Sequence, residues 1–174
     1  MRKYLLIIAF ALTTSFLQAQ ILSIPDTNFK AALLAHSPII DLNNDKDIQV
    51  TEAFLVKDIN VNQKFIKNLT GIEYFQSLTS LYCGNNELTT LDVSKNNALI
   101  NLDCSSNQLT TLDLSNNTAL TSLYFSNNEL AKLDVHKNNT LNILDCSYNQ
   151  LTTLNLSNNI ALISLCILNQ VQCN

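Results

Sequence analysis

The sequence predicts a mainly β solenoid, a fold of stacked coils, from three regularities. Almost every position between residues 78 and 161 recurs at intervals of 21, most visibly at Leu78, Leu99, Leu120, Leu141 and Leu162. Each 21-residue unit divides again into steps of 10 and 11, because the pattern that begins at Leu78 begins anew at Leu88. An asparagine closes each half-unit. Repeating units this short bury their apolar edges only against one another, which builds an extended surface.

Strands are expected where apolar residues alternate with polar ones. Each half-unit has an apolar pair two positions apart, such as Leu81 with Cys83 or Leu91 with Val93. A period of two is typical of a strand with one buried face. Ten or eleven residues also leave too little chain for a helix of ordinary length between strands. The sequence therefore predicts short parallel strands on both sides of each coil.

Two columns of asparagine are expected to shape the turns. Asparagine tolerates left-handed backbone, and its amide satisfies turn N–H and C=O groups that an inward bend leaves unpaired. Because buried polar groups must be paired, we expect a structural role for these amides; a polar ligand-binding column is the alternative. The first column comprises Asn86, Asn107, Asn128 and Asn149, and the second comprises Asn96, Asn117, Asn138 and Asn159.

One column of the repeat holds cysteine. A position that accepts either Cys or Phe is an apolar core position, and buried cysteine behaves as a small hydrophobe. We therefore expect buried free thiols at this column. Cys166 and Cys173 lie outside it and are candidates for a disulfide in an oxidising compartment. The column comprises Cys83, Cys104 and Cys146, with Phe125 in the intervening unit.

Residues 1–19 are expected to be a targeting segment outside the fold. Arg2 and Lys3 give a positive start, residues 5–12 form an apolar run, and Leu17-Gln18-Ala19 ends the segment. This order is typical of a secretory signal peptide, with cleavage near Ala19. A transmembrane anchor is the alternative, but the run is shorter than the ~20 apolar residues that span a bilayer.

Residues 20–55 are expected to form an N-terminal cap. Asp26 precedes Phe29, Ala32 and Leu33, which have helical spacing, and Pro38 ends the pattern. A stack of repeats needs such a cap, because its first coil would otherwise expose a leucine edge. The solenoid would then occupy residues 56–174, as one 22-residue unit, four 21-residue units and one incomplete unit.

The cap contains an acidic loop with the spacing of a calcium ligand set. Hard cations take six to eight oxygens, which alternate side chains of a tight loop and a late Glu can supply. The loop resembles EF-hand and dockerin-type loops, so calcium is one expectation. The alternative is a solvated acidic loop before a helix over residues 51–57. Lys46 stands where the pattern has Gly, and left-handed backbone there carries a cost. The expected ligands are Asp41, Asn43, Asp45, Asp47 (through its carbonyl) and Glu52.

Charge and composition argue against two function classes. The chain has 10 basic and 14 acidic residues, and without Arg2 and Lys3 the balance of 8 to 14 gives a net charge of −6. An acidic chain without a basic patch is a poor nucleic-acid binder. Neither His36 nor His136 has a nucleophile and carboxylate at a catalytic spacing, and two glycines leave no phosphate-binding loop. We therefore expect neither a nucleic-acid partner nor enzymatic activity.

Residues between the buried positions of each predicted strand face solvent. On the first strand they alternate Tyr with Asp, which favours a recognition face because Tyr gives a large contact area at low entropy cost. Packing of exposed residues along the sheet is the alternative. The second strand carries acidic residues, expected as a solvated column bonded to turn amides; ion binding between coils is the alternative. The first column is Tyr82, Asp103, Tyr124 and Asp145, and the second is Asp92, Asp113, Asp134 and Asn155.

The repeated pattern L-x-x-L-x-(C/L/V)-x-x-N, from Val56 onwards, resembles leucine-rich repeat proteins, closest to the 21-residue class of secreted bacterial proteins. The stretch 56–77, with the sequence LTGIEYF, is similar to a longer internalin-like repeat. The resemblance implies a solenoid used for binding and adhesion, without catalysis. It covers about two thirds of the chain.

These observations predict an exported bacterial protein, secreted or on the outer surface, that binds a protein or glycan through its strand face. The alternative is a structural surface protein that self-associates through an uncovered solenoid end. A fragment of a longer adhesin is a third expectation, because the unit that begins at Leu162 is incomplete. No stretch after the leader is long and apolar enough to span a membrane.

Overall fold

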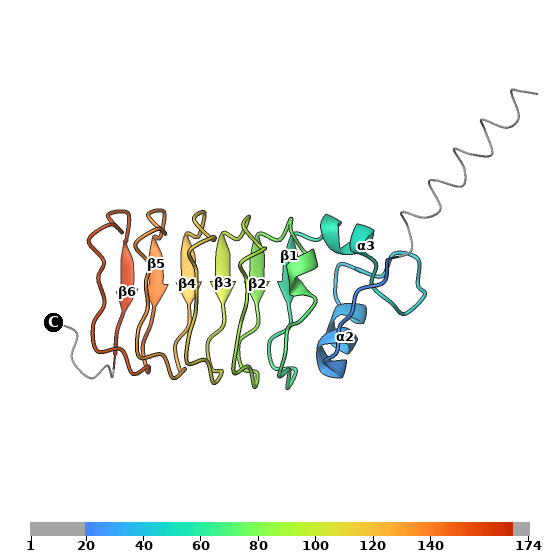
Figure 1. Cartoon of the computed structure of the whole chain (residues 1–174), viewed down its shortest axis with the longest axis horizontal. Coiled ribbons are helices and arrows are strands. Elements are labelled where there is room, and N and C mark those ends of the chain that lie inside the picture. Colours follow the sequence, from blue (N-terminus) through green and yellow to red (C-terminus); the bar gives the residue numbers. More distant parts are fainter. Residues whose placement is uncertain (1–19, 169–174) are drawn as a thin grey trace, which may run out of the picture.

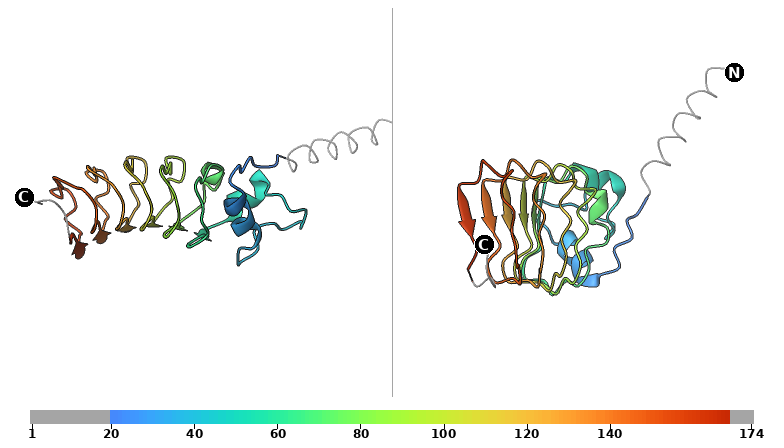
Figure 2. Two further views of the ribbon diagram at one scale, coloured as in Figure 1. Left: turned by 90° about the horizontal axis from the view of Figure 1, so that it is seen from below. Right: turned by 60° about the vertical axis from the view of Figure 1, so that its left-hand side comes forward.

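The structure is a computed structural model that describes residues 20–168. The leader predicted over residues 1–19 and the predicted partner Cys173 lie outside this range. The chain winds into stacked coils with a small helical cap at one end (Figure 1). Six short strands, one for each coil, form a parallel sheet in the order β1 to β6 (Figure 2). The strands are β1 (Asp58–Asn60), β2 (Ser80–Tyr82), β3 (Asn101–Asp103), β4 (Ser122–Tyr124), β5 (Ile143–Asp145) and β6 (Ser164–Cys166).

The sequence period sets the register of the sheet. Leu81 pairs with Leu102, and Leu102 with Leu123, so each step along the sheet is one 21-residue unit. Between β1 and β2 the step is 22 residues, because Ile59 pairs with Leu81. Equivalent side chains therefore stack directly above one another. The mainly β solenoid with parallel strands and a helical cap is confirmed.

The prediction of a second strand in each coil is wrong for the part of the chain described. After Leu88 the backbone turns back on itself within the coil: the N–H of Asn96 bonds to the carbonyl of Val93 at 2.9 Å, and that of Leu99 to the carbonyl of Asn96 at 3.1 Å. Neighbouring coils are joined here by asparagine side chains, such as Asn117, whose Nδ2 donates to the carbonyls of Val93 and Asn96. We call residues 78–88 and their equivalents the strand half, and residues 89–98 and theirs the turn half.

The core is a continuous stack of apolar side chains inside the coils. Leu78, Leu99, Leu120 and Leu141 are fully buried, and so is Phe125 in the cysteine column. Cys83 and Cys104 are buried free thiols, as predicted, and Cys146 is buried as well. Burial raises the pKa of the Cys83 and Cys104 thiols, because the anionic form loses its hydration.

The cap consists of helices α2 (Thr27–Leu34) and α3 (Val50–Leu55), followed by β1 and the short 3₁₀ helix η1 (Ile72–Tyr74). The helix predicted after Asp26 is confirmed: Asp26 is the N-cap of α2 and its Oδ1 accepts the N–H of Phe29 at 2.9 Å. The helix predicted over residues 51–57 ends two residues earlier, at Leu55. The buried residues of α2 are Phe29, Ala32 and Leu33, the apolar positions that predicted it.

The side chains of Asp26, Asn28 and His36 bond the cap to the first coil. The second oxygen of Asp26 accepts the N–H groups of Lys67 and Asn68, at 2.8 and 3.1 Å. Asn28 Nδ2 donates to the carbonyl of Phe65. His36 Nε2, just after α2, accepts the N–H of Asn60 and so satisfies part of the outer edge of β1. The first leucine edge is thereby covered. Among residues 20–168, no helix has the length and hydropathy to cross a membrane.

Candidate recognition face

The predicted Tyr and Asp residues form one outward-facing column on the sheet. Tyr82 pairs with Asp103, Asp103 with Tyr124, and Tyr124 with Asp145, each on the next strand. All four residues are half-buried. The structure therefore brings the predicted residues together in one row. Asn60 extends the row on β1, and the half-buried Cys166 extends it on β6.

Short side chains flank this row on the side towards the end of each strand. Gly84 follows Tyr82, and an added Cβ there would lie 3.2 Å from the carbonyl oxygen of Ser105 and 3.3 Å from Asp103 Oδ1. Serines 105, 126 and 147 take the same place on the following coils. A large side chain in this second column would crowd the next coil and cover the row. Glycine and serine therefore keep the tyrosines and aspartates accessible.

The aspartates of the row are held by backbone amides. Asp103 Oδ1 accepts the N–H of Ser105 at 3.0 Å. Asp145 Oδ1 accepts both the N–H and the hydroxyl of Ser147, at 3.1 and 2.6 Å. One oxygen of each carboxylate is thus fixed in the turn, which orients the other. The row is preorganised, which lowers the entropy that a partner must overcome.

A pocket of about 550 Å³ lies where the cap meets the first coil. Its walls come from Ala31 of α2 and its C-cap Ala35, and from Asn60 and Asn62 of the first coil. Asn62 Oδ1 accepts the N–H of Gly84 at 2.6 Å, so the pocket adjoins the row. Sequence reasoning missed it, although Asn60 stands 22 residues before Tyr82 and shares its register.

The acidic column of the turn half lines a second hollow, a groove of about 1170 Å³. Each member accepts the N–H two residues ahead: Asp92 that of Ser94, Asp113 that of Ser115, and Asp134 that of His136. Those amides hold the pKa of Asp113 and Asp134 below the ordinary value of 3.8, and the side chain and N–H of Ser94 do so for Asp92. Asn155 makes the same bond to Ser157. The acidic column thus makes the bonds to turn amides that the sequence predicted for it.

The two asparagine columns lie at the ends of the two half-coils, buried in both cases. In the first column, Asn107 Nδ2 donates to the carbonyls of Cys83 and Cys104, and its Oδ1 accepts the N–H of Leu88. The amides bond to backbone groups instead of to one another. Left-handed backbone falls on the residue before this column, and not on the column itself: Asn85, Ser106, Asn127 and Tyr148.

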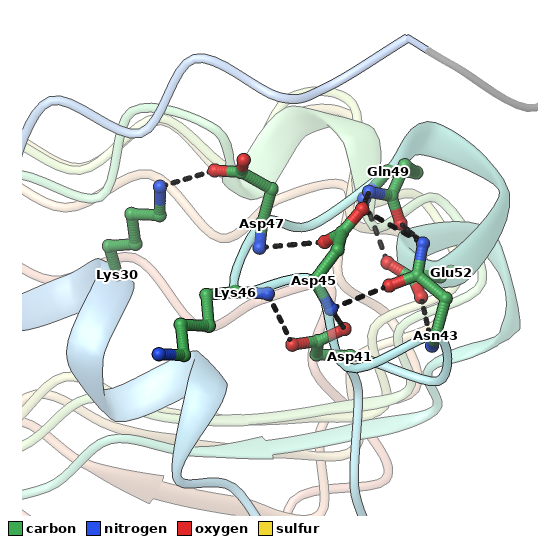
Figure 3. A network of polar contacts seen from close by, with 8 residues as sticks. All are labelled: Lys30, Asp41, Asn43, Asp45, Lys46, Asp47, Gln49 and Glu52. Atoms are coloured by element: carbon green, nitrogen blue, oxygen red, sulfur yellow. Dashed lines mark hydrogen bonds and ion pairs between the residues drawn. The ribbon is translucent and has the colours of Figure 1, made fainter.

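The predicted calcium loop forms a closed hydrogen-bond network (Figure 3). Asp41 accepts the N–H groups of Asp45 and Lys46, and Asp45 accepts Nδ2 of Asn43. Buried Glu52 accepts the backbone N–H of Leu42, Asn43 and Gln49. Within residues 20–168, no three His, Cys, Asp or Glu side chains are placed to hold a metal ion.

Two details bear on the fit of a cation to this loop. Asp47 points out of the network and pairs with Lys30 of α2 (Figure 3), so its side chain is unavailable, in keeping with the predicted use of its carbonyl. Lys46 adopts φ 68°, so the turn that usually requires Gly forms in spite of the side chain. The loop therefore forms the left-handed turn at Lys46, while its carboxylate oxygens are engaged by N–H groups. Calcium at this loop stays a prediction.

Solved structures share this fold. The functional domain of InlJ from Listeria monocytogenes, described as including a cysteine ladder, aligns with a TM-score of 0.80 and 36% identity, over 87% of this chain and 34% of its own. Internalin C2 from the same organism aligns with a TM-score of 0.77 and 18% identity, over 90% of this chain and 71% of its own. A leucine-rich repeat protein from Leptospira interrogans gives 0.67 and 23%, over 72% and 35%.

These likenesses fix the fold class. The chain is a leucine-rich repeat solenoid, similar in structure to internalins. It spans about a third of the length of the InlJ chain that it matches. Neither a protein-family model nor a curated protein sequence matches it. The likeness to internalin C2 and the Leptospira protein concerns the fold alone, at 18% and 23% identity.

Proposed function

We propose that this protein is an exported recognition module that binds a protein partner through its strand face. The observation that carries the proposal is the row of Tyr82, Asp103, Tyr124 and Asp145, preorganised by turn amides and flanked by glycine and serine. The two tyrosines supply a large, rigid contact area, and the two carboxylates supply oriented hydrogen-bond acceptors. The likeness to internalin structures supports a role in recognition; secretion, a bacterial surface location, adhesion and glycan binding belong to the proposal as well.

The absence of catalysis stays a prediction. It is supported by the groove of the turn half, because the catalytic groups of an enzyme converge on one point. In the groove the carboxylates Asp92, Asp113 and Asp134 run in a line along the coils.

Capture by an immobilised protein tests the proposal. Partners are collected from cell extracts on the wild type and on a Tyr82→Ala/Tyr124→Ala variant. Tyr148→Asn is the matched control, because it removes an exposed tyrosine outside the row and restores the asparagine found at the equivalent position 127. We expect capture to be lost in the double variant and kept in the control. Equal capture by all three proteins would exclude the strand face, and prior protease treatment of the extract distinguishes a protein from a glycan.

A second candidate function, self-association, rests on the last described coil. Apolar side chains around β6 are open to solvent, with Ile160 at 92% and Ile163 at 86% exposed, and Leu165 on the strand itself at 42%. β6 is the last strand of the described sheet, and an edge strand with apolar neighbours favours pairing with another chain. Light scattering over a concentration series tests it: growth in mass that Ile163→Lys suppresses supports association, and a constant monomer mass rejects it.

We propose further that the loop from Asp41 to Glu52 binds calcium weakly, through Asp41, Asn43, Asp45, the carbonyl of Asp47 and Glu52. The left-handed Lys46 supports this, because the turn already forms. The N–H groups that now occupy the oxygens compete with the ion, so we expect a dissociation constant of about 10⁻⁴–10⁻³ M. Calcium at five times that constant should add about 1 kcal/mol of stability. A melting temperature that millimolar calcium does not raise, or raises equally in Asp45→Ala, would contradict the proposal.

A further inference from the structure

Charge is divided unequally between the two halves of the coils. The strand halves from Leu78 to Leu151 contain four acidic residues, Glu87, Asp103, Glu129 and Asp145, and neither lysine nor arginine. The turn halves from Thr89 to Ala161 contain three acidic residues and three lysines, Asp92, Asp113, Asp134, Lys95, Lys132 and Lys137. The strand half is therefore negative, while the turn half is balanced; two of the four charges, Asp103 and Asp145, lie on the sheet itself.

Little on the strand half compensates this charge. Glu87 has an ion pair with Lys67 of the preceding coil, at 3.6 Å, with the lysine largely exposed. Asp103 and Asp145, in the row itself, are bonded to neutral amide or hydroxyl groups of Ser105 and Ser147. Like charges on a sheet destabilise it, and Tyr124 stands between these two carboxylates. Their negative potential is thus left for a ligand.

The spacing of the row points to the form of that ligand. Neighbouring strands lie about 4.8 Å apart, so Asp103 and Asp145, two strands apart, are separated by about 10 Å at the backbone. An α-helix laid along the row presents residues i and i+7 about 10.5 Å apart on one face, with i+3 or i+4 between them. An extended strand presents same-face residues about 6.6 or 13 Å apart, which do not match.

We propose that the strand face accepts a cationic α-helical segment of a partner protein, with Lys or Arg seven residues apart over Asp103 and Asp145. This inference rests on the proposed function of the face. Tyr124 lies beneath the intervening helical turn, and Tyr82 beside Asp103 adds a cation–π contact for the first basic side chain. The two halves of the coil thereby differ in role: the strand half selects a cation, and the turn half is neutral overall.

Fluorescence anisotropy with labelled peptides tests the proposal. The probe is an alanine-based helical peptide with two lysines seven residues apart; its controls carry glutamates at the same places, or lysines five residues apart on opposite faces. The variant is Asp103→Asn/Asp145→Asn, which keeps each Oδ1 acceptor for the turn. The matched control is Asp92→Asn/Asp113→Asn, which removes the same charge from the turn half, where Asn155 shows that Asn is tolerated.

We expect the first variant to weaken binding of the seven-spaced lysine peptide about tenfold, since each exposed ion pair contributes modestly, and the control variant to change it less than twofold. Binding should fall with added salt. Equal weakening by both variants, equal binding of the glutamate peptide, or no binding of the seven-spaced lysine peptide to the wild type would each overturn the proposal. If the peptide with lysines five residues apart bound as tightly as the seven-spaced one, the proposed seven-residue spacing would be wrong. The wild type could also bind none of the peptides while still capturing a partner that the Tyr82→Ala/Tyr124→Ala variant does not capture. That result would reject this inference and leave the proposed function standing.

Discussion

Asn107 and Asn117 close the two halves of the same coil, and only Asn107 is bonded through both ends of its amide. Its Oδ1 accepts the N–H of Leu88, for which the structure shows no backbone acceptor, and its Nδ2 donates to three carbonyls. Asn117 Nδ2 donates to the carbonyls of Val93 and Asn96, which also accept backbone N–H groups from Asn96 and Leu99. The Oδ1 atoms of its whole column are buried and accept no hydrogen bond from the described residues.

This difference shows that identical residues at identical spacing contribute unequally to the stability of the fold. In the strand half the amide replaces a backbone bond that the turn cannot make. In the turn half the asparagine Nδ2 adds a second donor to carbonyls that already accept a backbone N–H. Its own Oδ1 stays buried without a donor from the described residues. Net stabilisation by a hydrogen bond depends mainly on whether its removal leaves a buried group unpaired. The two columns should therefore respond differently to mutation.

The largest expected effect separates Asn107→Ala from Asn117→Ala. Asn107→Ala leaves the Leu88 N–H buried and unpaired, and we expect it to lower the free energy of unfolding by about 3 kcal/mol. Asn117→Ala orphans no backbone group and removes an unpaired oxygen, so we expect a loss of about 1 kcal/mol, mostly from the small cavity. Urea denaturation followed by circular dichroism measures both. Equal losses, or a larger loss for Asn117→Ala, would contradict the distinction between the columns.

This distinction also marks where sequence reasoning stopped. The 21-residue period predicted the coils, the buried columns and the register, because stacked identical units leave little choice. It could not separate the halves, since Leu81-x-Cys83 and Leu91-x-Val93 show the same alternation. What differs is backbone pairing: Cys83 N–H bonds to the carbonyl of Asp103 on the next coil, whereas the turn half bonds within its own coil. The cap pocket was missed because it needs α2 to lie against β1.

The next effect concerns the inner and outer sides of the strand half. Cys104 is fully buried and Cys166 is half-buried on the outward row. We expect Cys104→Ser to cost about 2 kcal/mol, because a hydroxyl enters the apolar core, and Cys166→Ser to cost less than about 0.5 kcal/mol. The same urea measurement applies. A tolerated Cys104→Ser would show that the column is more polar than its burial indicates.

Thiol reactivity independently tests the difference between the buried side and the outward side of the strand half. Burial raises the pKa of the Cys83 and Cys104 thiols, which reduces the thiolate that alkylating agents attack. In the presence of a reductant, which opens any Cys166–Cys173 disulfide, we expect iodoacetamide to modify Cys166 in the folded protein while Cys83 and Cys104 react only after denaturation. Peptide mass spectrometry locates the modified residues. Labelling of Cys104 at the rate of Cys166 would mean that the coils open far more readily than the packed core suggests.

The smallest expected effect lies in the acidic column of the turn half. Turn N–H groups hold the pKa of Asp113 and Asp134 below 3.8, as the side chain and N–H of Ser94 do for Asp92, so each ionised carboxylate stabilises the folded state. That contribution is present above the unfolded pKa of about 3.8 and is lost as the pH falls through the lower folded values.

We therefore expect the melting temperature to fall further between pH 5 and pH 3 in the wild type than in the triple variant Asp92→Asn/Asp113→Asn/Asp134→Asn. The amide keeps the Oδ1 acceptor without titrating, as Asn155 does beside Ser157. At pH 7 the two proteins should be similar, because the variant loses charge-assisted hydrogen bonds but also the repulsion between Asp92 and Asp113. If the triple variant were as acid-sensitive as the wild type, the pH dependence would lie elsewhere. Asp26, whose pKa stays low despite partial burial because it accepts several backbone N–H groups where the cap meets the first coil, is then the group to replace next.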